Sequence, residues 1–229
     1  MGRILSSLLA AGMLLGSAPG GAPAQDTRVL LVVGLGGTPE YRETFHRQAT
    51  GIRDALTELG LSRDHVVYVG ERPDEHAGEM DGEATREGLE EAVQRVARGA
   101  GPRDRILMIL IGHGTSRGDE VRFNLPGPDV SPAEVAALLE GAFPTQTVAV
   151  VNTTEASGPF VEALSGPNRV ILTATRTARE RNETRFGRFF AAALEGEGAD
   201  LDKDGRLSLL EVFQYAAREV QRHYEEQNL

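Results

Sequence analysis

Residues Arg105–Gly112 read RILMILIG, and this continuous apolar run decides the fold class. Arg28–Gly34 (RVLLVVG) and Thr147–Asn152 (TVAVVN) have the same character, with many β-branched residues. Strands with so few polar positions are buried on both faces, as in a parallel sheet that helices cover on either side. His65–Gly70 (HVVYVG) and Arg169–Thr175 (RVILTAT) predict two further strands.

Stretches with helical periodicity separate these runs along the chain. The predicted helices are Pro39–Leu59, Thr85–Gly99, Ser131–Glu140, Asn182–Glu195 and Leu209–Gln227. The alternation of strands and helices predicts an α/β fold with a mainly parallel sheet and helices on both faces. No internal repeat or low-complexity linker divides the chain, so we expect a single domain over residues 25–229.

The N-terminus has the pattern of a secretory signal peptide. Arg3 gives it a positive start, Ile4–Ala18 is apolar or small, and Ala22–Ala24 supplies a small-x-small cleavage site. The apolar run is too short and too rich in Gly and Ser for a membrane span. The sequence therefore predicts a signal peptide over 1–24 and a periplasmic or secreted chain without stable membrane insertion. The alternative is an uncleaved N-terminal anchor.

The composition excludes several classes of protein. Removal of residues 1–24 takes away Arg3 and no acid, so the net charge of −10 becomes −11. An acidic surface without a basic cluster repels nucleic acid and anionic membranes, so we expect no nucleic-acid partner. The chain has no cysteine, which excludes disulfides, thiolate catalysis and a lipoprotein anchor.

The stretch Asp200–Glu211 reads DLDKDGRLSLLE and matches the EF-hand loop for calcium. Asp200, Asp202 and Asp204 alternate, so that their carboxylates can converge on one hard cation. Gly205 stands where the loop needs a sharp turn. The spacing therefore predicts a Ca²⁺ site near the C-terminus.

Two further ligands are expected where this loop ends. The backbone carbonyl of Arg206 and both carboxylate oxygens of Glu211 would complete the set. The preceding helix ends near Leu194 and no second loop of this kind is visible, so we expect weak binding, with a Kd on the order of 10⁻⁴ to 10⁻³ M. The alternative is an acidic turn that caps the following helix without metal.

Parallel sheets carry their functional residues beyond the carboxyl ends of the strands. Arg105–Gly112 leads into His113, and the glycines on both sides of this histidine leave its imidazole accessible. Thr147–Asn152 leads into residues 153–158, which read TTEASG. If the two strands are neighbours, the side chains of His113 and Glu155 lie within about 8 Å at the same edge.

These two strand ends carry a resemblance to a known family. A strand that ends in Gly112-His113-Gly114, followed by a strand whose turn closes with Ser157-Gly158, resembles the caspase/legumain-type cysteine peptidases. Thr173-Ala174-Thr175 and the Asp-Gly loop before Ser208–Glu211 are similar to the legumain-like branch. The resemblance covers residues 28–226 and implies a caspase-like three-layer fold.

The resemblance also implies roles for individual residues. His113 would be the general base and acid, and Gly114 would contribute an amide to an oxyanion hole. The nucleophilic cysteine would stand two residues before Ser157, where this chain has Glu155. A carboxylate is a poor nucleophile toward amides, and its charge opposes a developing oxyanion. We therefore expect a vestigial site at His113, Gly114 and Glu155.

A hydrolase that uses a hydroxyl nucleophile with His113 is the alternative. Its candidates are Thr153, Thr154 and Ser157. A third hypothesis is a small-ligand site at the turn Gly34–Gly37, although a tight turn is the simpler interpretation.

The remaining histidines give weaker indications. His46 is expected to be a solvated residue on a helix, and His223 to fill a contact near the helix end. No HxxxH or HExxH spacing links His46, His65 and His76, so the sequence does not indicate a zinc site.

Together these patterns predict a secreted calcium-binding protein that is related to caspase/legumain-type peptidases and acts in binding or scaffolding. Its expected partners are calcium and a peptide or protein ligand in the groove near His113. Whether it is an enzyme stays open, with a non-catalytic role favoured because the thiol is absent.

Overall fold

The structure is a computed structural model that describes residues 25–118, 120–177 and 184–227. The predicted signal peptide over 1–24 lies outside the described residues. Within them, no helix combines the length and the apolar character needed to cross a membrane.

A six-stranded sheet with the order β3-β2-β1-β4-β7-β8 forms the middle of the molecule, and every neighbouring pair in it is parallel. Its strands are β1 (Thr27–Val33), β2 (Val66–Gly70), β3 (Gly82–Glu83), β4 (Arg105–Ile111), β7 (Thr147–Asn152) and β8 (Arg169–Thr173). The strand order reverses between β1 and β4, and β7 pairs with β4 on the other side. The carboxyl ends of β1, β4 and β7 therefore meet at one edge.

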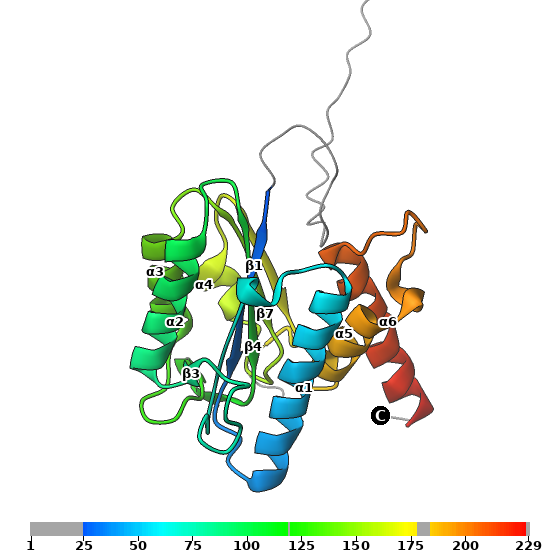
Figure 1. The fold of residues 1–229 in the computed structure, drawn as a ribbon. Coiled ribbons are helices and arrows are strands. Elements are labelled where there is room, and N and C mark those ends of the chain that lie inside the picture. Colours follow the sequence, from blue (N-terminus) through cyan, green and yellow to red (C-terminus); the bar gives the residue numbers. More distant parts are fainter. Residues whose placement is uncertain (1–24, 119, 178–183, 228–229) are drawn as a thin grey trace, which may run out of the picture.

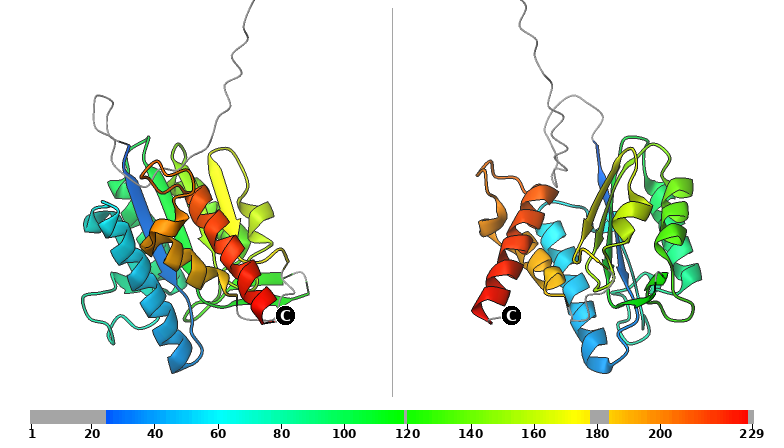
Figure 2. Two further views of the ribbon diagram at one scale, coloured as in Figure 1. Left: turned by 90° about the vertical axis from the view of Figure 1, so that its right-hand side faces the viewer. Right: turned by 180° about the vertical axis from the view of Figure 1, so that it is seen from behind.

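Helices cover both faces of this sheet, which makes three layers (Figure 1). One face carries α1 (Pro39–Glu58), α5 (Phe186–Glu195) and α6 (Leu209–Glu226). The other face carries α2 (Arg86–Gly99), α3 (Pro132–Ala142) and α4 (Phe160–Leu164). Figure 2 shows α1, α5 and α6 together in front of the sheet in its left view. The predicted α/β three-layer architecture is thus confirmed.

The continuous apolar runs are explained by burial on both faces. In β4, Leu107 and Ile109 belong to the core beneath α1, α5 and α6, whereas Ile106 and Met108 belong to the core beneath α2, α3 and α4. All four side chains are at most 1% exposed. A strand with two buried faces has no position where a polar side chain reaches water, which is why the sequence does not alternate.

The structure differs from the sequence prediction mainly in short elements. A two-stranded antiparallel hairpin, β5 (Gly114–Arg117) and β6 (Glu120–Phe123), follows β4 directly. Its strands are short and partly exposed, so they carry no apolar run that could have indicated them. The helix α4 and the strand β3 are also too short to produce a recognisable pattern, so the sequence did not predict them.

Ser131 and Glu134 form a capping box at the start of α3. The Ser131 hydroxyl accepts a hydrogen bond from the Glu134 amide, and the Glu134 carboxylate accepts one from the Ser131 amide. Arg86 of α2 donates to the same carboxylate at 2.6 Å. This hydrogen bond, followed by those from Ser131, lowers the pKa of Glu134 to about 2. Glu134 therefore caps α3 and connects it to α2.

We expect Glu134→Gln to lower the free energy of unfolding by about 1 kcal/mol at neutral pH, because it removes a helix cap partner and a half-exposed ion pair. The folded pKa of Glu134 is depressed, so its contribution is complete above the unfolded pKa of about 4.3 and is lost as pH falls toward 2. Urea denaturation of both proteins between pH 7 and the acid limit measures this. A difference that does not shrink below the unfolded pKa would contradict it.

Candidate functional site

His113 and Glu155 meet at the carboxyl edge of the sheet. His113 follows β4 and Glu155 follows β7, and these two strands are paired neighbours. The His113 Nδ1 atom lies 3.0 Å from Glu155 Oε1. Each side chain is about three-quarters buried, with 24% and 22% of its area exposed. The sequence expectation that these side chains approach within about 8 Å is confirmed.

Two aromatic rings of α1 hold the imidazole of His113 in place. The Tyr41 and Phe45 rings contact it edge to face, with centroid distances of 4.7 and 5.1 Å. Contacts of this kind are favourable and restrict the tilt of the ring. The carboxylate of Glu155 and these two rings therefore fix the position of the imidazole.

A pocket of about 560 Å³ opens beside this pair. Its floor is the carboxyl edge of the sheet, with Gly112, His113, Thr153 and Glu155. Residues of α1 line one wall, and the start and inner face of α5 line the other. A volume of this size is within the range of sites for small molecules or short peptide segments, about 300 to 1,000 Å³.

The walls of this pocket carry charges of both signs beside apolar side chains. Arg47, Arg185 and Arg188 contribute positive charge, and Glu195 joins Glu155 on the negative side. The lining also includes Gln48 of α1. The Nε2 atom of Gln48 is buried and has no hydrogen-bond partner among the described residues. A buried donor without a partner is costly, so a ligand acceptor at this point would stabilise the wall.

The hydroxyl candidates for a nucleophile all belong to buried residues, although Thr153 also lines the pocket floor. Ser157 is fully buried, and its hydroxyl lies 3.0 Å from the Thr175 hydroxyl. Thr153 donates to the Leu110 carbonyl at 3.0 Å. The hydroxyl of Thr154 is buried and unpaired among the described residues. Two of the three hydroxyls are thus committed to structural hydrogen bonds.

The turn Gly34–Gly37 is packed against protein. The Gly34 amide donates to the Ile111 carbonyl and the Leu35 amide to the Asn124 carbonyl. The Gly36 amide donates to the Glu71 carboxylate at 2.9 Å. These amides already have acceptors, so they do not form an anion cradle, and the interpretation as a tight turn agrees with the structure.

The predicted calcium loop brings three carboxylates together. Ligand oxygens of Asp200, Asp202 and Asp204 all lie within 4.8 Å of one another. Gly205 has a φ of +77°, which is the sharp turn the pattern requires, and its amide donates to Asp200. The Oδ1 atom of Asp200 is buried and unpaired among the described residues. Leu207 anchors the loop in the core beneath α5 and α6.

Glu211 lies at the start of α6, beside the loop but outside the group of three aspartates. One of its carboxylate oxygens accepts from the Leu201 amide at 2.9 Å, and the other accepts from the Ser208 amide at 2.9 Å. The hydrogen bonds from Ser208 are the main reason that the pKa of Glu211 is lowered. Glu211 therefore caps α6. Arg206, whose backbone carbonyl is the other expected ligand, is exposed and follows Gly205 in the loop.

The predicted calcium loop lies away from the edge of the sheet that carries His113 and Glu155. In Figure 1 the orange segment before α6 lies at the end where β1 begins, whereas the strands point their carboxyl ends the other way. The pocket extends from that edge along α5 as far as Glu195, which precedes the loop closely in the chain.

The expectation for His46 is wrong. Its side chain is buried, with 6% of the residue exposed, because it lies on the same side of α1 as the buried Ala49 three residues later. Its ring stacks on that of His76 with a centroid distance of 3.6 Å. Burial, followed by the charge of His76, lowers the pKa of His46. The helical spacing to Ala49 could have indicated this burial from the sequence.

A third residue joins the two histidines. Glu79 lies three positions after His76 in the loop between β2 and β3, and its carboxylate is 3.3 Å from His46 Nε2. Ligand atoms of His46, His76 and Glu79 lie within 4.8 Å of one another. Sequence reasoning missed this group because His46 is on a different element, and no spacing pattern connects it with the loop. His223 instead contacts the ring of Phe189 near the end of α6.

No family model matches this chain, and no curated protein matches it. Among solved structures, the chain is similar to the crystal structure of a Geobacter sulfurreducens protein from a structural-genomics programme. The sequences are 16% identical, and the match covers 56% of this chain and 50% of that chain with a TM-score of 0.40. The chain thus spans about half of that structure. The class that the fold defines is an α/β protein with a parallel sheet between two helical layers.

We expect Gly114→Ala to destabilise the protein by roughly 1 to 3 kcal/mol, because a Cβ there would lie 2.9 Å from both Ala156 Cβ and Thr154 Oγ1. The matched control is Gly141→Ala in α3, where a Cβ meets nothing within 4 Å and alanine favours the helix. Chemical denaturation of both variants measures the difference. Equal stability of the two variants would show that the site after β4 tolerates a side chain.

Proposed function

We propose that the chain is a calcium-stabilised binding protein of the caspase/legumain type that has no catalytic thiol. The proposal rests on the Gly112-His113-Gly114 and Ser157-Gly158 motifs and on the three-layer α/β fold that carries them. The absence of cysteine from the whole chain supports a non-catalytic role. A periplasmic or secreted location is part of the proposal and rests on the pattern of residues 1–24.

The contact between His113 and Glu155 is the observation that carries this proposal. Glu155 occupies the place where the resemblance puts the nucleophilic cysteine, and its carboxylate is 3.0 Å from the imidazole. An acyl-enzyme on a carboxylate would be a labile anhydride, and the negative charge would repel the oxyanion formed beside it. The pair is better suited to binding: it offers a fixed carboxylate and an oriented imidazole to a polar ligand.

The chemistry of the pocket favours a peptide or protein segment as that ligand. Backbone amides and carbonyls of a peptide need donors and acceptors at close range, and the pocket supplies both. The Gln48 amide nitrogen is a buried donor for a carbonyl, and Glu155 is an acceptor for an amide or a basic side chain. Arg188, exposed on α5, can pair with an acidic side chain. A lining with both charged and neutral groups is suited to a peptide ligand that has both charged and neutral residues.

The proposed role of calcium is to stabilise the end of the fold opposite the edge with His113 and Glu155. Carboxylate oxygens of Asp200, Asp202 and Asp204 already lie close together. The buried Oδ1 atom of Asp200 has no hydrogen-bond donor among the described residues, and a cation would give it a partner. Glu211 stands next to the loop and caps α6, so it would link the ion to that helix. Each carboxylate oxygen has two lone pairs and can accept from an amide while it binds a cation.

A hydrolase with a hydroxyl nucleophile is the second candidate. In its favour, Thr153 lines the pocket, and the buried hydroxyl of Thr154 has no hydrogen-bond partner among the described residues. Ser157 is engaged with Thr175 and has no exposed surface, which counts against its use as a nucleophile. The binding role therefore remains the proposal.

Calcium at a hundredfold excess over Kd should stabilise the protein by about 2.7 kcal/mol and raise its Tm by roughly 5 to 10 °C. Asp202→Asn with Asp204→Asn should remove this effect, because the loop keeps its shape but loses charge. The control is Glu90→Gln with Glu91→Gln, which removes the same charge from the exposed side of α2. Thermal melts with calcium and with magnesium make the comparison. A calcium shift that persists in the aspartate variant would exclude the loop as the site.

Peptides selected from a displayed random library on the wild-type protein should bind Gln48→Met at least tenfold more weakly, because the variant has no donor in the pocket wall. Gln94→Met on the exposed face of α2 is the control and should bind them normally. Fluorescence polarisation with the labelled peptides measures the affinities. Selection of no peptide, or equal binding by both variants and by His113→Ala, would refute a ligand groove at this place.

The same protein distinguishes the hydrolase. A fluorophosphonate probe should leave the wild type unlabelled. Labelling that disappears in His113→Ala and in Ser157→Ala would replace the binding proposal with a hydroxyl-dependent hydrolase.

A further inference from the structure

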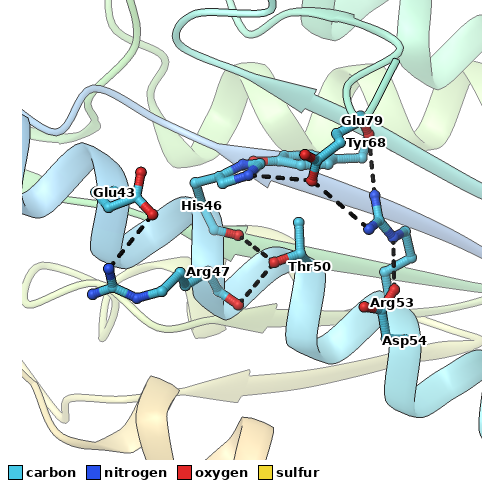
Figure 3. A network of polar contacts seen from close by, with 8 residues as sticks. All are labelled: Glu43, His46, Arg47, Thr50, Arg53, Asp54, Tyr68 and Glu79. Atoms are coloured by element: carbon cyan, nitrogen blue, oxygen red, sulfur yellow. Dashed lines mark hydrogen bonds and ion pairs between the residues drawn. The ribbon is translucent and has the colours of Figure 1, made fainter. Parts of the chain in front are cut away.

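A group of two imidazoles and a carboxylate forms on the side of α1 that faces the loop between β2 and β3. His46 comes from the middle of α1, while His76 and Glu79 come from that loop. Figure 3 shows His46 on the helix with the Glu79 carboxylate and Tyr68 beside it. The Glu79 carboxylate is 3.3 Å from His46 Nε2, and the rings of His46 and His76 are stacked at 3.6 Å. Three side chains that can bind a metal, from two separate parts of the chain, thus lie close together.

His46 is held as a metal ligand usually is. Its Nδ1 atom lies 2.9 Å from the hydroxyl of Tyr68, a residue of β2 that is fully buried. Histidine ligands almost always use one ring nitrogen for the metal and direct the other to a fixed hydrogen-bond partner. When Tyr68 accepts from Nδ1–H, the lone pair is on Nε2, which is the nitrogen that faces Glu79. The buried tyrosine therefore sets the orientation of the ring and can select the tautomer.

Side chains of both charges surround His46, His76 and Glu79. The guanidinium of Arg53, on α1, is 4.0 Å from the Glu79 carboxylate. That guanidinium also bonds to the Asp54 carboxylate at 3.0 Å and to the Glu79 backbone carbonyl at 3.2 Å. Arg53 therefore has other partners, and the Glu79 carboxylate already lies closer to His46 than to Arg53.

We propose that His46 Nε2, an imidazole nitrogen of His76 and the carboxylate of Glu79 bind one Zn²⁺ ion. Two histidines and one carboxylate form a ligand set of the type found in zinc sites that keep a coordination position open. Imidazole nitrogen suits zinc, whereas calcium and magnesium prefer oxygen. The open position would hold water or a donor atom of a ligand.

Zinc binding requires only a local adjustment of the loop side. The stacked rings are nearly parallel, with an interplanar angle of 21°, so their lone pairs do not yet converge. His76 lies in a turn and is only partly buried, and its ring can rotate about two side-chain bonds. His46 is the fixed ligand and His76 the movable one. The ion would tie the loop between β2 and β3 to α1.

This zinc site would also act on the pocket, because α1 belongs to both. Phe45, which contacts His113, is the neighbour of His46, and Gln48 of the pocket wall is two positions further on. A zinc ion that holds α1 against β2 at His46 would fix the position of α1, and thereby the position of this wall of the pocket. His46, His76 and Glu79 belong neither to the predicted calcium loop nor to the pocket lining, so the zinc site does not need calcium or a pocket ligand in order to form.

The test is calorimetric titration of the untagged, full-length mature protein with Zn²⁺, in excess calcium so that the acidic loop does not compete. One zinc ion should bind per chain. His76→Ala and Glu79→Gln should each weaken binding at least tenfold, and both change partly or fully exposed residues, so the fold is retained. Tyr68→Phe should weaken it about 10- to 100-fold, because it removes only the partner of the liganding ring. His65→Ala is the control with an imidazole removed elsewhere and should bind normally.

A second readout separates ligation from a structural effect. Co²⁺ in place of zinc should give the visible absorption of a tetrahedral site in the wild type and in His65→Ala, and lose it in His76→Ala. Zinc should raise the Tm of the wild type and leave that of His76→Ala unchanged. Absence of stoichiometric zinc binding in the wild type would overturn the proposal. Binding of equal strength in the wild type, His76→Ala and Glu79→Gln would overturn it as well.

Discussion

Burial of the central strands on both faces is the constraint on which the rest of the structure depends. β1 and β4 have no face exposed to water, so helices must cover the sheet on either side, and the connections between parallel strands must cross over. The same arrangement brings all carboxyl ends to one edge. Residues that are distant in the sequence, such as His113 and Glu155, therefore become neighbours without any direct signal between them.

The helix α1 has a special place in this arrangement, since each of its sides contributes to a different polar site. Phe45 and Gln48 border the pocket at the carboxyl edge, and His46 and Arg53 border the group that includes Glu79. A polar site on a helix is tolerated beside a core only when its groups have partners. His46 has Tyr68 and Glu79 as partners, whereas the buried Nε2 atom of Gln48 has none among the described residues.

Under the proposed resemblance to caspase/legumain-type peptidases, Glu155 stands where those enzymes have a thiol, and this difference changes what the edge of the sheet can do. A thiolate beside an imidazole is a nucleophile, but a carboxylate beside an imidazole is a stable pair that attracts polar groups. The scaffold positions this pair closely: Tyr41 and Phe45 hold the ring, and Glu155 directly follows β7. The proposed calcium site in the acidic loop would stabilise a part of the fold that does not include this pair.

The sequence by itself determined the fold class and the main strands and helices, and it placed His113 and Glu155 at one edge on the condition that their strands are neighbours. It could do so because runs such as RILMILIG report burial directly, and because parallel strands must end at a common edge. It did not predict the hairpin after β4, whose short strands have no apolar pattern.

Only the tertiary structure decided the remainder. It showed that Glu211 caps α6 beside the three aspartates, that the predicted calcium loop lies at the end opposite the carboxyl edge of the sheet, and that His46 is buried against His76 and Glu79. These facts depend on how a loop folds back over a helix. Local sequence patterns report on neighbours three or four residues apart, and they contain no information on contacts of that kind.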